Sequence, residues 1–168
     1  MVKRGAMAQT GVTRREVFKG AAAVALAAAW PDAKARAQGF LANLAPEEPV
    51  EKTLQRLFGG RPIKEGSQVI TLELPLIAED GGNVAMSVEV KSPMTPQSYV
   101  KAIYVLSDKN PRPLNAKFTL TPACGQAYVA ANLRLADTGD VRAVAETQDG
   151  ALLMVKRSVR VVVAGCAA

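Results

Sequence analysis

The chain has 168 residues, of which 49% are hydrophobic and 21% are charged, with 21 basic and 15 acidic residues and no histidine. This length suits one domain with a short extension. The lack of histidine excludes the Ser/His/Asp and Cys/His arrangements of hydrolases and removes the commonest metal ligand.

Residues 1–37 are predicted to be an export signal rather than part of the fold. Thr13-Arg14-Arg15-Glu16-Val17-Phe18-Lys19 is a nearly complete twin-arginine motif, and a small apolar run from Gly20 to Trp30 follows it. Ala35-Arg36-Ala37 fits a cleavage site, so we expect a mature periplasmic chain from Gln38 without a membrane segment. An uncleaved anchor is the alternative, although the run is shorter than the ~20 residues that span a bilayer.

Removal of the signal changes the charge balance. Residues 1–37 contain seven basic and two acidic residues, so 14 basic and 13 acidic residues remain. A net charge of +1 and six remaining aromatic residues do not suit a nucleic-acid-binding surface. We therefore expect no nucleic-acid partner.

Residues 38–67 are predicted to be a lead-in followed by a short helix. Pro46-Glu47-Glu48 resembles a helix start, with carboxylates where the helix dipole favours them. An apolar stripe at helical spacing follows, and Gly59-Gly60 ends it; the stripe consists of Val50, Leu54, Leu57 and Phe58. The pattern leaves open whether this amphipathic helix packs on the domain or on a partner.

Residues 68–163 show the period of two that is typical of strands with one buried face. The apolar positions of three such runs are Val84, Met86, Val88 and Val90; Leu114, Ala116, Phe118 and Leu120; and Val129, Ala131, Leu133 and Leu135. Turn residues separate the runs at regular intervals, and Asp149-Gly150 predicts a hairpin with a type I′ turn. About seven strands without intervening helices predict an all-β fold, an immunoglobulin-like antiparallel sandwich.

The end of the chain carries a cysteine on a short segment of small residues. The apolar strand ends at Val163, and we expect residues 164–168 to form a flexible arm, made of Ala164, Gly165, Cys166, Ala167 and Ala168. A thiol there is competent to be conjugated, because a few per cent of an unperturbed thiol with a pKa of ~8.5 is ionised at neutral pH. Cys166 is thus the candidate attachment site for a covalently bound group.

The second cysteine, Cys124, supports a different interpretation. In an oxidising compartment a structural Cys124–Cys166 disulfide would close a loop of ~40 residues and stabilise the fold by roughly 4 kcal/mol. The protein would then be a structural or interaction sandwich. The remaining acidic residues lie mostly beside turns, and the sequence contains no recognisable metal site, cofactor motif or catalytic set. We therefore expect no cofactor and no enzymatic activity of its own.

From about Ile70 to its end the chain resembles the Y subunit of the Sox sulfur-oxidation carrier, the SoxY family. The residues that carry the resemblance form short motifs in a fixed order: Leu72-Glu73-Leu74-Pro75, Ile77-Ala78-Glu79-Asp80-Gly81, Ser92-Pro93-Met94-Thr95, Tyr99-Val100-Lys101-Ala102-Ile103, Asn110-Pro111-Arg112-Pro113, Phe118-Thr119-Leu120-Thr121-Pro122, Arg134-Leu135-Ala136 and Gly165-Cys166.

The resemblance implies a carrier of thiosulfate-derived intermediates that partner enzymes of sulfur oxidation act on. Cys166 would hold the substrate covalently, and Gly165 would belong to the carrier arm. The resemblance also implies an immunoglobulin-like fold and a heterodimer with a second sandwich subunit, SoxZ, exported together in the folded state. The family tail is typically Gly-Gly-Cys-Gly-Gly, so the alanines at 164, 167 and 168 are departures. Cys124 is another departure, and it would act as a redox latch if it paired with Cys166.

Overall fold

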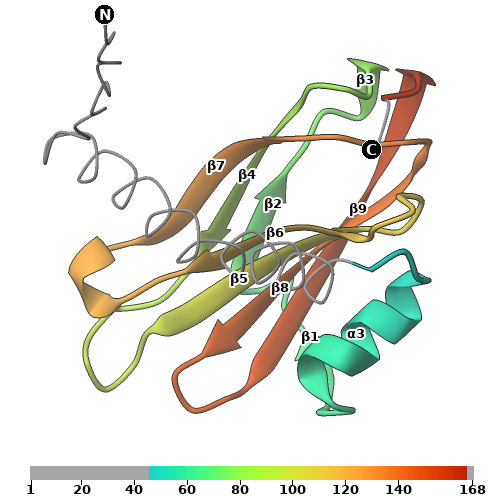
Figure 1. Cartoon of the computed structure of the whole chain (residues 1–168). Helices are drawn as coiled ribbons and strands as arrows, with labels where there is room; N and C mark the ends of the chain where they lie inside the picture. Colours follow the sequence, from blue (N-terminus) through green and yellow to red (C-terminus); the bar gives the residue numbers. More distant parts are fainter. Residues whose placement is uncertain (1–45, 166–168) are drawn as a thin grey trace, which may run out of the picture. The chain divides into compact units, whose positions relative to one another are not determined.

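The computed structural model describes residues 46–165. The predicted export signal, Cys166, Ala167 and Ala168 lie outside these residues. Within the described range the elements are α3 (Val50–Phe58), β1 (Ile63–Glu65), β2 (Ile70–Glu73), β3 (Ile77–Asp80), β4 (Val84–Val90), β5 (Val100–Ser107), β6 (Leu114–Thr119), the 3-10 helix η1 (Pro122–Cys124), β7 (Ala127–Leu133), β8 (Gly139–Thr147) and β9 (Leu152–Val163). Figure 1 shows their arrangement.

The strands form two sheets packed as a sandwich, which confirms the predicted fold class. The larger sheet has the order β1-β9-β8-β5-β6, with β3 also paired to β9, and the smaller has the order β2-β4-β7. The pairing is antiparallel except along one edge of β9. There β1 pairs in parallel with the first residues of β9, Leu152 to Met154, and β3 pairs in parallel with its last residues, Arg160 to Val163. The short strand β1 lies within the segment 38–67 that was predicted to precede the sandwich, so the sheet begins earlier than the sequence indicated.

The main core lies between the two sheets. The strand alternation read from the sequence is confirmed for β4, where the four apolar residues are all buried: Val84, Met86, Val88 and Val90. They pack against inward-facing residues of the larger sheet, including Ile103, Val105 and Val159. Burial of these apolar faces is the main source of stability for such a fold.

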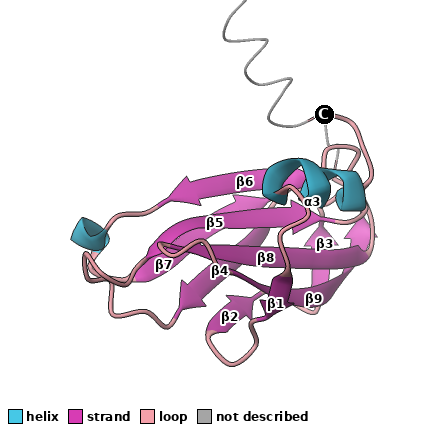
Figure 2. Cartoon of the chain, turned by 90° about the horizontal axis from the view of Figure 1, so that it is seen from below, coloured by secondary structure: helices cyan, strands magenta, loops and turns pink. Residues whose placement is uncertain are grey.

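The helix α3 covers the outer face of the larger sheet (Figure 2). Val50 and Phe58 are buried, and the Phe58 ring meets the Tyr104 ring edge-on with centroids 5.0 Å apart. The helix begins at Val50, after Pro49, rather than at Pro46, and ends at Gly59 in the left-handed conformation with φ of 60°. The apolar stripe thus packs on its own domain.

The helix also explains why β5 lacks alternation. Seven of its eight residues are buried, because Ile103 and Val105 face the main core while Ala102, Tyr104 and Leu106 lie in the second cluster with α3. A strand covered on both faces carries a continuous apolar run.

The hairpin predicted at Asp149-Gly150 joins β8 to β9, with Glu146 opposite Leu152. The predicted turn type was wrong. A type I′ turn needs positive φ at both central residues, whereas only Gly150 has it, with φ of 84°. The Gly150 N–H donates to Thr147 O at 3.0 Å and the Thr147 N–H donates to Ala151 O at 3.0 Å, the pattern of a longer turn closed by a left-handed glycine.

Candidate functional site

Gly165, two residues after the end of β9, is bound to the sandwich through Leu135 and Gly81. We call these three residues the C-terminal anchor. The Gly81 N–H donates to Val163 O at 2.8 Å, and the Leu135 N–H donates to Gly81 O at 2.7 Å. The Gly165 N–H then donates to Leu135 O at 3.1 Å. Backbone groups from three distant parts of the sequence thus form one chain of hydrogen bonds at the end of β9.

The anchor has no room for side chains at its glycines. A Cβ atom on Gly165 would lie 2.5 Å from both Gly81 O and Gly82 N, which is shorter than the van der Waals distance and would be a steric clash. Gly165 is buried, whereas Ala164 and Val163 are exposed. The prediction that a free arm begins after Val163 and includes Gly165 is therefore corrected, because Gly165 is docked on the sandwich. Ala164 remains outside, where its methyl group meets solvent.

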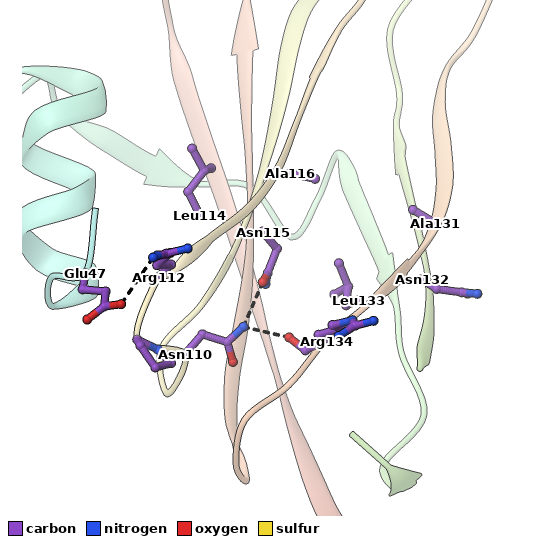
Figure 3. A pocket seen from close by; sticks show the side chains of 11 residues that line it. Glu47, Asn110, Arg112, Leu114, Asn115, Ala116, Ala131, Asn132, Leu133 and Arg134 are labelled. Atoms are coloured by element: carbon purple, nitrogen blue, oxygen red, sulfur yellow. Dashed lines mark hydrogen bonds and ion pairs between the residues drawn. The ribbon is translucent and has the colours of Figure 1, made fainter. Parts of the chain in front are cut away.

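Asn110 holds the opposite side of the segment that carries Leu135. Its side-chain amide donates to Arg134 O at 2.7 Å and to Asn115 Oδ1 at 2.9 Å (Figure 3). Its Oδ1 accepts from the Ala136 N–H at 2.9 Å. Asn110 is 7% exposed, so these groups have little access to water. Segment 134–136 is consequently fixed between Asn110 on one side and Gly165 on the other.

A cleft of about 840 Å³ opens beside this segment. It lies between β6, an edge strand of the larger sheet, and β7, an edge strand of the smaller sheet. Its lining comes from both strands and from the β5–β6 loop, and consists of Glu47, Asn110, Pro111, Arg112, Leu114, Asn115, Ala116, Ala131, Asn132, Leu133 and Arg134. Figure 3 shows these side chains around the cleft.

The cleft carries two guanidinium groups and one carboxylate. Arg112 and Arg134 are the cations, and Glu47 is the anion. The Arg112 Nη2 atom lies 3.4 Å from Glu47 Oε1, and both side chains are more than half exposed. An exposed pair of this kind is worth about 0–1 kcal/mol, so it does not neutralise the cleft firmly.

Cys124 lies in η1, in the connection between β6 and β7, and is exposed. The Thr121 Oγ1 atom is 3.9 Å from its sulfur. Leu135, which holds Gly165, follows the other end of β7, and the seven-residue strand between them extends ~20 Å. Cys166 is one residue beyond Gly165, and one residue spans only ~3.8 Å. A Cys124–Cys166 bridge would therefore require Gly165 to leave the anchor.

The buried carboxylate of Glu146 belongs to a structural network beneath α3. It accepts from Tyr104 Oη at 3.0 Å and from Arg61 Nη1 at 3.1 Å. Burial raises its pKa, but the hydrogen bonds from Tyr104 and Arg61 outweigh this, and the pKa of Glu146 is lowered. Burial, followed by the hydrogen bond to Glu146, raises the pKa of Tyr104 to about 12.

Residues 46–165 contain neither a candidate metal-binding cluster nor a membrane-spanning helix. No group of three or more cysteine, aspartate or glutamate side chains in this range is arranged to hold a metal ion. No helix in this range is long and apolar enough to cross a membrane.

Sequence reasoning missed the anchor and the cleft. Gly81 and Asn110 entered the sequence analysis only as parts of family-like motifs, and Leu135 entered it as an apolar strand position and as part of one such motif. The structure brings these motifs together, although they are separated by more than twenty residues each in sequence. No local pattern could reveal a contact that depends on how three loops meet.

Comparisons with known proteins place the chain in a family. The family model described as "Sulfur oxidation protein SoxY" matches residues 54–166. The solved structure of the sulfur carrier protein SoxY from Chlorobium limicola f thiosulfatophilum is similar, with 27% identity and a TM-score of 0.56 over 66% of this chain and 90% of that one.

A superoxide reductase (neelaredoxin) from Ignicoccus hospitalis has a TM-score of 0.50 at 16% identity, over 55% of this chain and 80% of that one. This likeness concerns the fold alone. No curated protein sequence matches the chain. Because the family model covers most of the described residues and extends to Cys166, the chain belongs to the SoxY family of sulfur oxidation proteins.

Proposed function

We propose that the protein is a periplasmic carrier that holds thiosulfate-derived sulfur intermediates covalently on Cys166 and presents them to partner enzymes. The observation that carries the proposal is the family match, which continues through Gly165 and includes Cys166. The similar Chlorobium structure is described as a sulfur carrier protein, which supports the same role.

The chemistry of the carrier needs only a thiol. In loading, the Cys166 thiol and thiosulfate form an S–S bond, giving protein–S–S–SO₃⁻ with release of one proton and two electrons to a partner haem enzyme. In unloading, water attacks the terminal sulfonate sulfur, releasing hydrogen sulfate and leaving protein–S–SH. Both steps use catalytic groups of the partners, so the carrier contributes the thiolate and its position.

The C-terminal anchor supports this role through its position. It fixes the backbone up to Gly165, so Cys166 follows directly after a docked residue. The attached group would start from a defined point on the sandwich. Such positioning limits the conformations that a partner enzyme must select, and ordering fewer residues on binding costs less entropy.

We also propose a second sandwich subunit, of the SoxZ type, as a stable partner, exported with this chain by the twin-arginine route. Exposed apolar side chains where β3 pairs with β9 support a protein contact there: Leu76 is 81% exposed, Ile77 55% and Val162 63%. Clustered exposed apolar residues are typical of interaction surfaces.

The test of the carrier function is mass analysis of the C-terminal peptide. Protein from cells that oxidise thiosulfate should carry a thiosulfonate or persulfide adduct on Cys166, and the Cys166→Ser variant should carry none while folding normally. Cys124→Ser is the matched control and should keep the adduct. An unmodified Cys166 during active sulfur oxidation would contradict the proposal.

A further inference from the structure

We propose that the β5–β6 loop, residues 108–113, holds the C-terminal anchor closed, and that a contact which moves this loop frees Gly165 from the sandwich. The coupling rests on contacts within residues 46–165, and only its use for a cargo rests on the proposed function. It gives an exposed loop beside the start of α3 a regulatory role at the other end of the chain.

The contact that closes the anchor is small. Within residues 46–165, the bond from the Gly165 N–H to Leu135 O at 3.1 Å is the only hydrogen bond that the chain makes after Val163. Gly165 has no side chain to bury, and Ala164 is exposed. Segments held by so few contacts open locally, without unfolding of the whole domain. The closed state therefore depends on how firmly Leu135 is kept in place.

Asn110 binds both peptide groups that flank Leu135. Arg134 O and Leu135 N belong to one peptide group, and Asn110 binds the oxygen at 2.7 Å. Leu135 O and Ala136 N belong to the next peptide group, and Asn110 Oδ1 accepts from that nitrogen at 2.9 Å. Because each peptide group is planar, Asn110 fixes one end of the same rigid unit whose other end accepts from Gly165.

The loop in turn fixes Asn110. The Asn110 amide also donates to Asn115 Oδ1 at 2.9 Å, and the Asn115 amide donates to the hydroxyl of Ser107, which is 3% exposed (Figure 3). Pro111 follows Asn110, and its carbonyl accepts from the Glu48 N–H at 3.2 Å. The residues that lead into α3 are thus connected to the C-terminal anchor through the loop.

The exposed part of the loop is where a partner can act on the anchor. Pro111 and Arg112 are exposed, whereas Asn110 is buried directly before them. A protein that binds there and displaces Asn110 weakens the hold on Gly165. Release frees Ala164 and Gly165, and two extended residues add ~7 Å to the free chain end. In the proposed carrier, an enzyme that docks on the loop would thereby lengthen the reach of the bound group.

Amide hydrogen exchange, measured by NMR on the reduced chain from Gln38, tests the coupling. Asn110→Ala should raise the exchange rate of the Gly165 amide about fivefold or more, because the peptide groups that hold the anchor lose their partner. Tyr104→Phe is the control, since it removes a buried hydrogen bond beneath α3. It should raise the rate for core amides such as that of Ile103 and leave the Gly165 rate unchanged.

Glu48 provides a matched pair of variants for the contact between the loop and the start of α3. Glu48→Ala removes its side-chain hydrogen bonds and keeps its N–H, whereas Glu48→Pro also removes the N–H that Pro111 O accepts. The Gly165 amide should exchange about twofold or more faster in Glu48→Pro than in Glu48→Ala, as expected for one lost hydrogen bond. Asn115→Ala removes the side chain that braces Asn110, should also raise the Gly165 rate, and replaces Asn110→Ala if that variant does not fold.

An unchanged Gly165 rate in Asn110→Ala, equal rates in the two Glu48 variants, or an equal rise in Tyr104→Phe would overturn the proposal. Failure of the carrier function is a separate result. If the Gly165 rate responds as expected but Cys166 is never loaded during sulfur oxidation, the coupling stands and the carrier function is wrong. If Cys166 carries sulfur in cells but the Gly165 rate does not respond, the coupling is wrong and the carrier function stands.

Discussion

Gly165 lies directly against Gly81, with no space for a side chain on either residue. A Cβ atom on Gly81 would lie 2.7 Å from the Gly165 nitrogen, and one on Gly165 would lie 2.5 Å from the Gly81 oxygen. Two glycines that are 84 positions apart in the sequence are thus required by the same contact. The glycine before Cys166 serves close packing at this point, in addition to any conformational freedom it gives the chain.

The first prediction concerns this contact. Gly165→Ala should lower the free energy of unfolding by about 1–3 kcal/mol, the usual cost of forcing extra atoms into a packed site. The one tryptophan, Trp30, lies in the predicted export signal, so urea unfolding of a chain that starts at Gln38 is best followed by circular dichroism. Ala164→Ser, at the exposed neighbouring position, is the control and should change stability by less than about 0.5 kcal/mol. Equal stability of Gly165→Ala and the wild type would show that Gly165 is not docked in solution.

Asn110 should be the most sensitive polar residue at this end of the sandwich. Asn110→Ala removes the side-chain partner of the Arg134 carbonyl and of the Ala136 N–H, and because both hydrogen bonds are part-buried, we expect a total loss of about 1–3 kcal/mol. Asn132→Ala, at an exposed position of the same cleft, should be nearly neutral. Thermal unfolding of the two variants provides the comparison, and similar melting temperatures would contradict the assigned role of Asn110.

The Tyr104–Glu146 pair should make stability depend on pH at both extremes. The pKa of Tyr104 is raised to about 12 from its ordinary value of 10, so its contribution is complete below pH 10 and is lost as the pH rises through 12. The pKa of Glu146 is lowered, so its contribution is present above its unfolded pKa and is lost as the pH falls through the folded value.

Tyr104→Phe tests this coupling. The variant should lose stability at neutral pH, because Glu146 loses a buried hydrogen bond, and its decline between pH 10 and 12 should be shallower than that of the wild type. Urea midpoints measured from pH 4 to pH 12 report both effects. Parallel curves for the two proteins above pH 10 would rule out Tyr104 as the titrating group.

Disulfide formation between Cys124 and Cys166 should compete with the C-terminal anchor. Peptide mapping without reductant should find both thiols unpaired in most molecules of the folded protein, because a bridge requires release of Gly165. Gly165→Ala should increase the bridged fraction. A nearly complete bridge in the wild type would instead favour the structural interpretation of the two cysteines.

Much of the fold followed from local patterns. The period of two predicted buried strand faces such as that of β4, and Gly59 correctly predicted the end of α3, whereas the start predicted at Pro46 was four residues too early. Predictions of this kind succeed because the side-chain period of a helix or strand is a local property of its backbone. The turn type at Asp149-Gly150 was wrong, since strand register adds one more residue to the loop.

The sequence by itself determined the chemistry that the protein has to offer: a chain without histidine, ending in a thiol two residues from its last residue, on a sandwich built from alternating strands. Only the tertiary structure decided where that end is held and what surrounds it. Gly81, Asn110 and Leu135 meet because they lie in the loops that follow β3, β5 and β7, and hydrogen bonds between loops that are distant in sequence leave no periodic trace in any one of them.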